Sequence, residues 1–228
     1  VTLSSSASGP LLTIQGRERV QIEGLTLDAN GKADGIRLVG QLSGLHLKHL
    51  SVNGFTKTGI VCEGALGYAG EREILLIDNV TLRSGSPEAT GISLKKGDEP
   101  PAYVRIEKST FSGPLQAGVV TNGALTEVEF RENVFSDAKT GIRIEGDGLR
   151  HRDLIFAYNS FHLGESGIRF TNMPASDSAG LGFYNNLFAG QSGPAVQIEK
   201  DFKVDDFLRM YSKNAGGAVN NWTDADKP

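Results

Sequence analysis

The sequence of 228 residues contains one cysteine, one tryptophan and only 7% aromatic residues. The single cysteine, Cys62, excludes an intrachain disulfide, and its place in an apolar pattern predicts a small core residue rather than a nucleophile. No segment approaches the ~18 consecutive apolar residues of a membrane-spanning helix, so we expect no such span. The formal net charge is -4 and the basic residues are scattered, which argues against nucleic acid as a partner. Cys and His residues show no metal-binding spacing, so we expect neither a metal nor another cofactor.

Glycine, in contrast, is abundant, and seven positions show a recurring motif. In each of them a Gly or Ala precedes two strand-spaced residues, nearly always both apolar, as in Gly35-Ile36-x-Leu38 and Gly141-Ile142-x-Ile144. The motif begins at Gly35, Gly59, Gly91, Gly118, Gly141, Gly167 and Ala195, with steps of 24, 32, 27, 23, 26 and 28 residues. A period of this length with variable insertions predicts a solenoid, in which each repeat buries its apolar face against its neighbours.

Two further apolar tracks run in phase with the first. One is an apolar-x-apolar pair, as in Val104/Ile106 or Leu154/Phe156, and five residues after each pair comes one large apolar residue, such as Phe111. Each repeat therefore contains three short segments of period two, which is the spacing of β-strands. Three strands and three turns per repeat predict an all-β parallel β-helix of about seven coils, rising roughly 34 Å at 4.8 Å per coil.

One turn position changes along the chain from apolar residues to Asn133, Asn159 and Asn186. An asparagine tolerates left-handed backbone, and its amide can bond to the equivalent residue one coil away. We therefore predict a buried ladder of these three asparagines. It should lie beside a stack of four phenylalanines, namely Phe111, Phe135, Phe161 and Phe188.

This pattern, from Leu12 to Ile198, resembles the right-handed parallel β-helix repeats of the pectin-lyase-like superfamily, whose second turn commonly holds an asparagine ladder. We expect a single β-helix domain, with an N-terminal cap in residues 1–11, coils in 12–200 and a C-terminal cap in 201–228. The cap should include Trp222 and a short amphipathic helix, because four apolar residues follow helical spacing: Val204, Phe207, Leu208 and Tyr211. The superfamily includes lyases, hydrolases, epimerases and phage tailspikes, so the resemblance leaves the function open.

If the asparagine turn is the superfamily's second turn, the glycine motif marks its first strand. In members that act on polysaccharides, the outer face of that strand lines the binding groove. Candidate binding residues on this face are Arg37, Lys95, Arg143, Glu145 and Arg169. Arg143 and Arg169 fall on neighbouring coils. They could bind the carboxylate of an acidic saccharide, or they could be ordinary surface residues paired with Glu145 and nearby acids.

The loops that follow this strand vary in length, and one of them contains His151 between Asp147 and Asp153. A histidine beside two carboxylates is the best candidate here for acid–base catalysis. No catalytic set of the superfamily can be transferred, because the acidic residues on the first strand do not cluster on adjacent coils and no Asp-Pro-His-Asp run occurs.

We therefore predict a non-catalytic carbohydrate-recognition or display module with an acidic polysaccharide as its ligand. The resemblance suggests that it is part of a larger bacterial, extracytoplasmic protein with additional domains. One alternative is a polysaccharide lyase or glycoside hydrolase acting on an acidic polysaccharide. Another is a structural or sensor segment attached to an unrelated domain such as a kinase.

Overall fold

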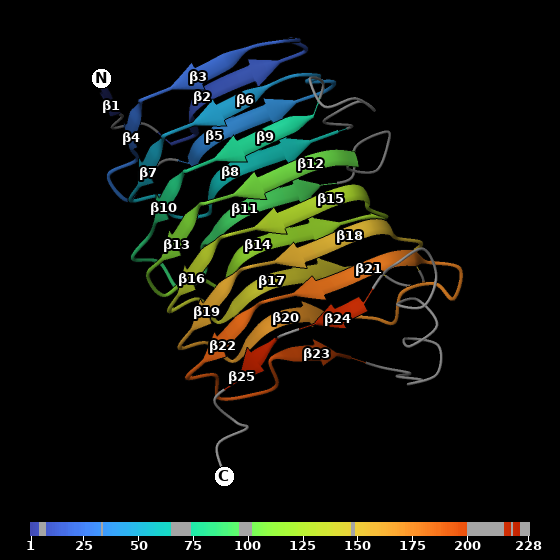
Figure 1. Ribbon diagram of the computed structural model, residues 1–228. Helices are drawn as coiled ribbons and strands as arrows, with labels where there is room; N and C mark the ends of the chain where they lie inside the picture. Colours follow the sequence, from blue (N-terminus) through green and yellow to red (C-terminus); the bar gives the residue numbers. More distant parts are fainter. Residues whose placement is uncertain are drawn as a thin grey trace.

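The computed structural model describes residues 1–4, 8–32, 34–64, 74–95, 102–146, 149–199, 217–219 and 221–223. These residues form three parallel sheets that run the length of the molecule (Figure 1). The first sheet contains β2 (Pro10–Gln15), β5 (Asp34–Val39), β8 (Thr58–Glu63), β11 (Thr90–Lys95), β14 (Ala117–Asn122), β17 (Thr140–Glu145), β20 (Ser166–Phe170) and β23 (Val196–Ile198). The second sheet contains β3 (Gln21–Glu23), β6 (His46–Lys48), β9 (Leu75–Asp78), β12 (Ala102–Glu107), β15 (Thr126–Arg131), β18 (Arg152–Ala157), β21 (Ala179–Tyr184) and β24 (Gly217–Val219). The third sheet contains β1 (Thr2–Ser4), β4 (Thr26–Asp28), β7 (Ser51–Asn53), β10 (Thr81–Arg83), β13 (Thr110–Ser112), β16 (Val134–Ser136), β19 (Ser160–His162), β22 (Leu187–Ala189) and β25 (Trp222–Thr223).

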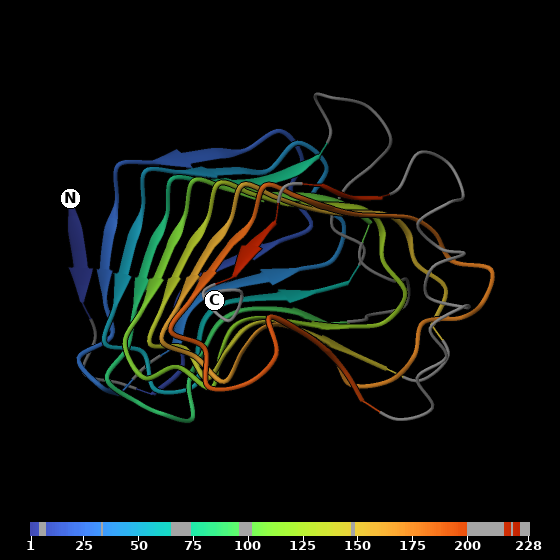
Figure 2. The same ribbon diagram turned by 60° about the horizontal axis from the view of Figure 1, so that its bottom comes forward.

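Each coil contributes one strand to each sheet, and each strand pairs in parallel with its equivalent in the next coil. Along every sheet the strands follow one another in sequence order, from blue to red (Figure 2). The pairing register aligns the predicted tracks, for example Ile142 with Ile168 and Phe161 with Phe188. The prediction of a parallel β-helix of about seven coils is therefore confirmed.

The core consists of the side chains that the three tracks direct inward. Nearly all of them are fully buried; Ile22, in an end coil, is only partly buried. The predicted phenylalanine stack is present, with ring centroids 4.6 Å apart for Phe111 and Phe135 and 4.9 Å apart for Phe135 and Phe161. Near-parallel rings at the coil spacing let each phenylalanine pack on the one below it while the strands keep their register.

The glycines of the first track are required by close packing rather than by unusual backbone angles. A Cβ atom at Gly141 would lie 2.5 Å from Cε1 of Phe161 and 2.6 Å from the carbonyl oxygen of Gly167. Each motif glycine thus lets the large residue of the third sheet in its own coil approach the first strand. In the last coil Ala195 occupies the glycine register while Thr223 occupies the phenylalanine register.

The predicted asparagine ladder is confirmed. Nδ2 of Asn133 donates to Oδ1 of Asn159 at 3.0 Å, and Nδ2 of Asn159 donates to Oδ1 of Asn186 at 3.0 Å. The ladder is one residue longer than predicted, because Asn186 donates in turn to Oδ1 of Asn221 at 2.9 Å. At its other end the amide N–H of Ser109 donates to Oδ1 of Asn133.

The two ends of the chain take part in the sheets. β1 lies within residues 1–11, and β24 and β25 lie within residues 201–228, the two ranges expected to form caps. Trp222 pairs with Leu187, so β25 extends the third sheet by one strand. The predicted helix residues, Val204, Phe207, Leu208 and Tyr211, lie outside the described residues. No helix in the described ranges is long and apolar enough to cross a membrane.

Candidate functional site

The outer face of the first sheet contains three ion pairs, one for each predicted arginine. Arg37 on β5 donates to Glu63 on β8 from Nε at 3.1 Å and from Nη2 at 2.7 Å. Arg143 pairs with Glu145 on the same strand, with Nε and Oε1 2.8 Å apart. These arginines therefore form ion pairs with nearby acids, which is one of the two alternatives that the sequence left open.

The third arginine, Arg169, pairs with Glu199, which lies one coil further along the axis. The predicted candidate Lys95 is exposed at the end of β11, beside Glu63 in register. Each of the three arginines is thus paired with a different carboxylate. The charge of each arginine is therefore balanced by a neighbouring acid.

Arg143 and Arg169 still differ from an ordinary pair of surface residues. They are register neighbours on β17 and β20, and their side chains are only 21% and 25% exposed. The Nε atom of each is buried and has no well-aligned hydrogen-bond partner among the described residues; for Arg143 the Nε–H is close to Glu145 but not directed at its oxygen. Val120, the neighbour of Arg143 on β14, is only 8% exposed, so apolar surface borders the pair. Two guanidinium groups therefore carry buried Nε–H donors for which the described residues provide no well-aligned acceptor.

His151 is placed differently from the exposed position that a loop suggests, since it is 2% exposed. Its Nδ1 accepts a hydrogen bond from the amide N–H of Leu125 at 3.2 Å, and its own amide donates to Oγ of Ser178 at 3.0 Å. Burial lowers the pKa of its imidazole to about 4, because the cationic form would lose its hydration. His151 therefore links neighbouring coils as a neutral side chain.

Of the predicted acid–base residues, the structure describes His151 and Asp153. Asp153 is exposed on β18, and no hydrogen bond or ion pair between described residues joins it to His151. Asp147 lies outside the described residues. Cys62 is fully buried, and burial together with the charge of Glu63 raises the pKa of its thiol well above the usual value, as expected for a core residue.

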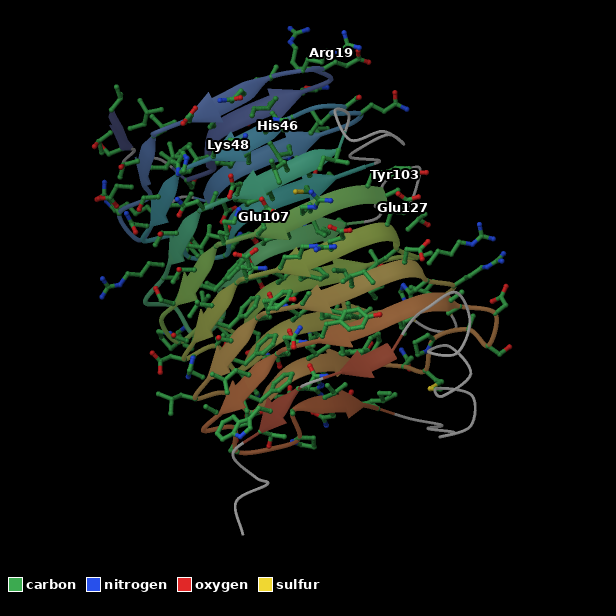
Figure 3. All side chains as sticks on the ribbon, in the orientation of Figure 1. Arg19, His46, Lys48, Tyr103, Glu107 and Glu127 are labelled. Carbon is green, nitrogen blue, oxygen red and sulfur yellow. The ribbon has the colours of Figure 1, made fainter. Side chains whose placement is uncertain are left out.

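A cluster of charged residues that was not predicted lies on the outer face of the second sheet. Glu129 on β15 accepts hydrogen bonds from Nε of Arg105 at 2.6 Å and from Nε of Arg131 at 2.9 Å. Figure 3 shows this face, with Tyr103 and Glu107 at opposite ends of β12. The outward positions could have been found from the sequence, because they alternate with the inward members of the second track.

Three sheets of parallel strands, each built from successive coils, and a buried asparagine ladder define a parallel β-helix. A family model described as a right-handed beta helix region matches residues 58–226, most of the chain. The chain therefore belongs to the right-handed β-helix family, and its fold is that of the pectin-lyase-like repeat proteins. No curated protein and no solved structure matches it.

Proposed function

We propose that this chain is a carbohydrate-recognition β-helix module that binds an acidic saccharide across Arg143 and Arg169. The observation that supports this function is the pair of buried Nε–H donors on adjacent strands, for which the described part of the chain offers no well-aligned acceptor. A buried donor without a partner loses free energy, which an incoming carboxylate or sulfate oxygen would restore. Guanidinium groups suit such oxygens because their planar N–H groups donate in parallel.

The glutamates that pair with these arginines affect the expected affinity in two ways. Glu145 and Glu199 hold the two guanidinium groups in place, which lowers the entropy lost when a ligand binds. They also neutralise the arginines, so a ligand anion competes with a carboxylate that is already present. We therefore expect modest affinity that falls as salt concentration rises.

Binding rather than catalysis is favoured by His151. A neutral imidazole with Nδ1 already bonded and 2% exposure is poorly placed to exchange protons with a substrate. As part of the same proposal, the module belongs to a larger bacterial protein outside the cytoplasm and presents the first sheet to a polysaccharide.

Calorimetric titration with oligogalacturonate and oligoalginate tests this proposal. The double change Arg143→Ala with Arg169→Ala should abolish binding. Arg105→Ala is a matched control, because it removes an ion-paired arginine from the outer face of the second sheet, and it should bind as the wild type does. Equal binding by the double variant would exclude this site.

Two other outcomes would point to the alternative functions. Release of unsaturated uronate products from the polymer would establish a polysaccharide lyase. Absence of binding to every acidic glycan by the wild-type chain would favour a structural or sensor segment.

A further inference from the structure

The outer surface of the second sheet changes character along the solenoid axis. In the early and middle coils the last and third-last residues of each strand, which face outward, are mostly charged, whereas in β18 and β21 they are apolar, aromatic or glycine. One register column reads Lys48, Asp78, Glu107, Arg131, Ala157 and Tyr184, and the other reads His46, Leu76, Arg105, Glu129, Ile155 and Gly182. Exposure to water does not favour apolar residues on the outer face of a strand. The apolar residues at this end of the sheet therefore need another explanation.

At this end the surface contains an open hollow of about 390 Å³. It is lined by Arg131, Ile155, Ala157, Tyr158, Tyr184 and Asn185. Its volume lies in the range of small-ligand sites, and its lining combines aromatic and aliphatic groups with a few polar ones.

Tyr184 lines the hollow, and its ring lies over Gly182. A Cβ atom at Gly182 would lie 2.8 Å from Cζ of Tyr184, so the ring occupies the space directly above that glycine. Gly182 holds an outward position whose register neighbour is Ile155, and any larger residue there would displace the tyrosine. The ring therefore lies against the sheet at Gly182 and forms part of the lining of the hollow.

Tyr158 borders the hollow from the neighbouring coil. Its backbone N–H donates to the carbonyl oxygen of Tyr184 at 2.8 Å, and its side chain is 57% exposed. It occupies the left-handed turn position before the asparagine ladder, with φ of 58°. The same position in the other described coils holds Gly24, His49, Asn79, Lys108, Glu132 and Asn185. The turn itself requires no aromatic ring, so the exposed tyrosine is explained by what it faces rather than by local conformation.

The polar groups of the lining show which ligand fits. Nε and Nη2 of Arg131 donate to Glu129 at 2.9 and 3.2 Å, so its charge is matched within the protein. The side-chain amide of Asn185 makes no hydrogen bond to another described residue. We infer that this hollow is a second carbohydrate site, which binds one neutral pyranose ring. The apolar ring face would stack on Tyr184 beside Tyr158, and the hydroxyl groups would bond to Asn185 and Arg131.

This site is separate from the proposed anion site, since it lies on another sheet, uses no residue of that site and takes an uncharged ligand. Ligand-detected saturation-transfer NMR tests it, with the methyl β-glycosides of glucose, galactose, mannose and N-acetylglucosamine as probes. At least one glycoside should receive saturation on the protons of its apolar face, with a millimolar Kd.

Four variants locate the binding. Tyr184→Ala should weaken it about tenfold, and Gly182→Ala should weaken it similarly by displacing the ring. Tyr184→Phe should retain it. Trp222→Ala is the control, because it removes an exposed aromatic residue from the third sheet, and it should change nothing.

Three results would overturn the inference. The first is no saturation transfer to any of the four glycosides. The second is a Kd that neither Tyr184→Ala nor Tyr158→Ala changes; Tyr158 is exposed, so its removal spares the core. The third is loss of glycoside binding in the Arg143→Ala and Arg169→Ala double variant, which would place the saccharide on the first sheet. Acidic-glycan binding can fail while glycoside binding succeeds, and the reverse, so the two proposals are tested independently.

Discussion

Replacement of Asn159 by leucine should destabilise the solenoid strongly, because this residue lies in the middle of the ladder. Its Nδ2 donates to Asn186 and to the carbonyl oxygen of Phe130, both at 3.0 Å. Its Oδ1 accepts from Nδ2 and from the backbone N–H of Asn133, at 3.0 and 3.1 Å. All four bonds are buried, so water cannot replace the lost partner.

The magnitude follows from what leucine leaves unpaired. Nδ2 of Asn133 keeps its bond to the carbonyl oxygen of Ile106, and Oδ1 of Asn186 keeps the backbone N–H of residue 159. The backbone N–H of Asn133 loses its acceptor, and the carbonyl oxygen of Phe130 loses the amide donor. Each buried group without a partner costs roughly 1–3 kcal/mol, so we expect a loss of roughly 2–6 kcal/mol in the free energy of unfolding.

Urea unfolding followed by circular dichroism measures this loss, and hydrogen exchange of the Asn133 amide reports its location. Because repeat proteins can unfold in parts, the exchange rate gives the more local measurement. Asn122→Leu serves as the control, since Asn122 is exposed at the end of β14. The reasoning is refuted if Asn159→Leu leaves both the unfolding midpoint and the protection of the Asn133 amide at their wild-type values.

Two further predictions concern packing and pH. Gly141→Ala should cost roughly 1–3 kcal/mol of unfolding free energy by overpacking against Phe161, whereas Gly85→Ala, with open space around it, should stay within about 1 kcal/mol of the wild type; equal midpoints would contradict the packing explanation. Between pH 6.5 and about 4 the unfolded chain binds a proton at His151 that the folded chain does not. The free energy of unfolding is therefore unaffected by His151 above pH 6.5, and it falls by roughly 3 kcal/mol in total as the pH drops to about 4. His151→Gln should flatten that part of a pH series of urea midpoints, and an unchanged slope would show that the histidine is not the titrating group.

The sequence alone determined the fold, because its evidence is local and repeated. Period two in three tracks, a glycine near the start of most strands of the first sheet and asparagines at one turn position are each visible in a short window. Their recurrence fixes which residues stack on which, as the register of Phe135 with Phe161 shows. The ladder followed from the same periodicity, although Asn221 was missed because the last coil departs from the spacing.

The tertiary structure decided the surface and its chemistry. Glu199 lies 30 residues from Arg169 in the chain, and their pairing depends on loop lengths that periodicity does not encode. The burial of His151 and the packing of the Tyr184 ring on Gly182 likewise depend on the tertiary structure, because a loop or a side chain must fold onto the sheet in each case. Inward residues repeat because every coil must fill the same core. Outward residues do not repeat, because the contacts that they make differ from one coil to the next.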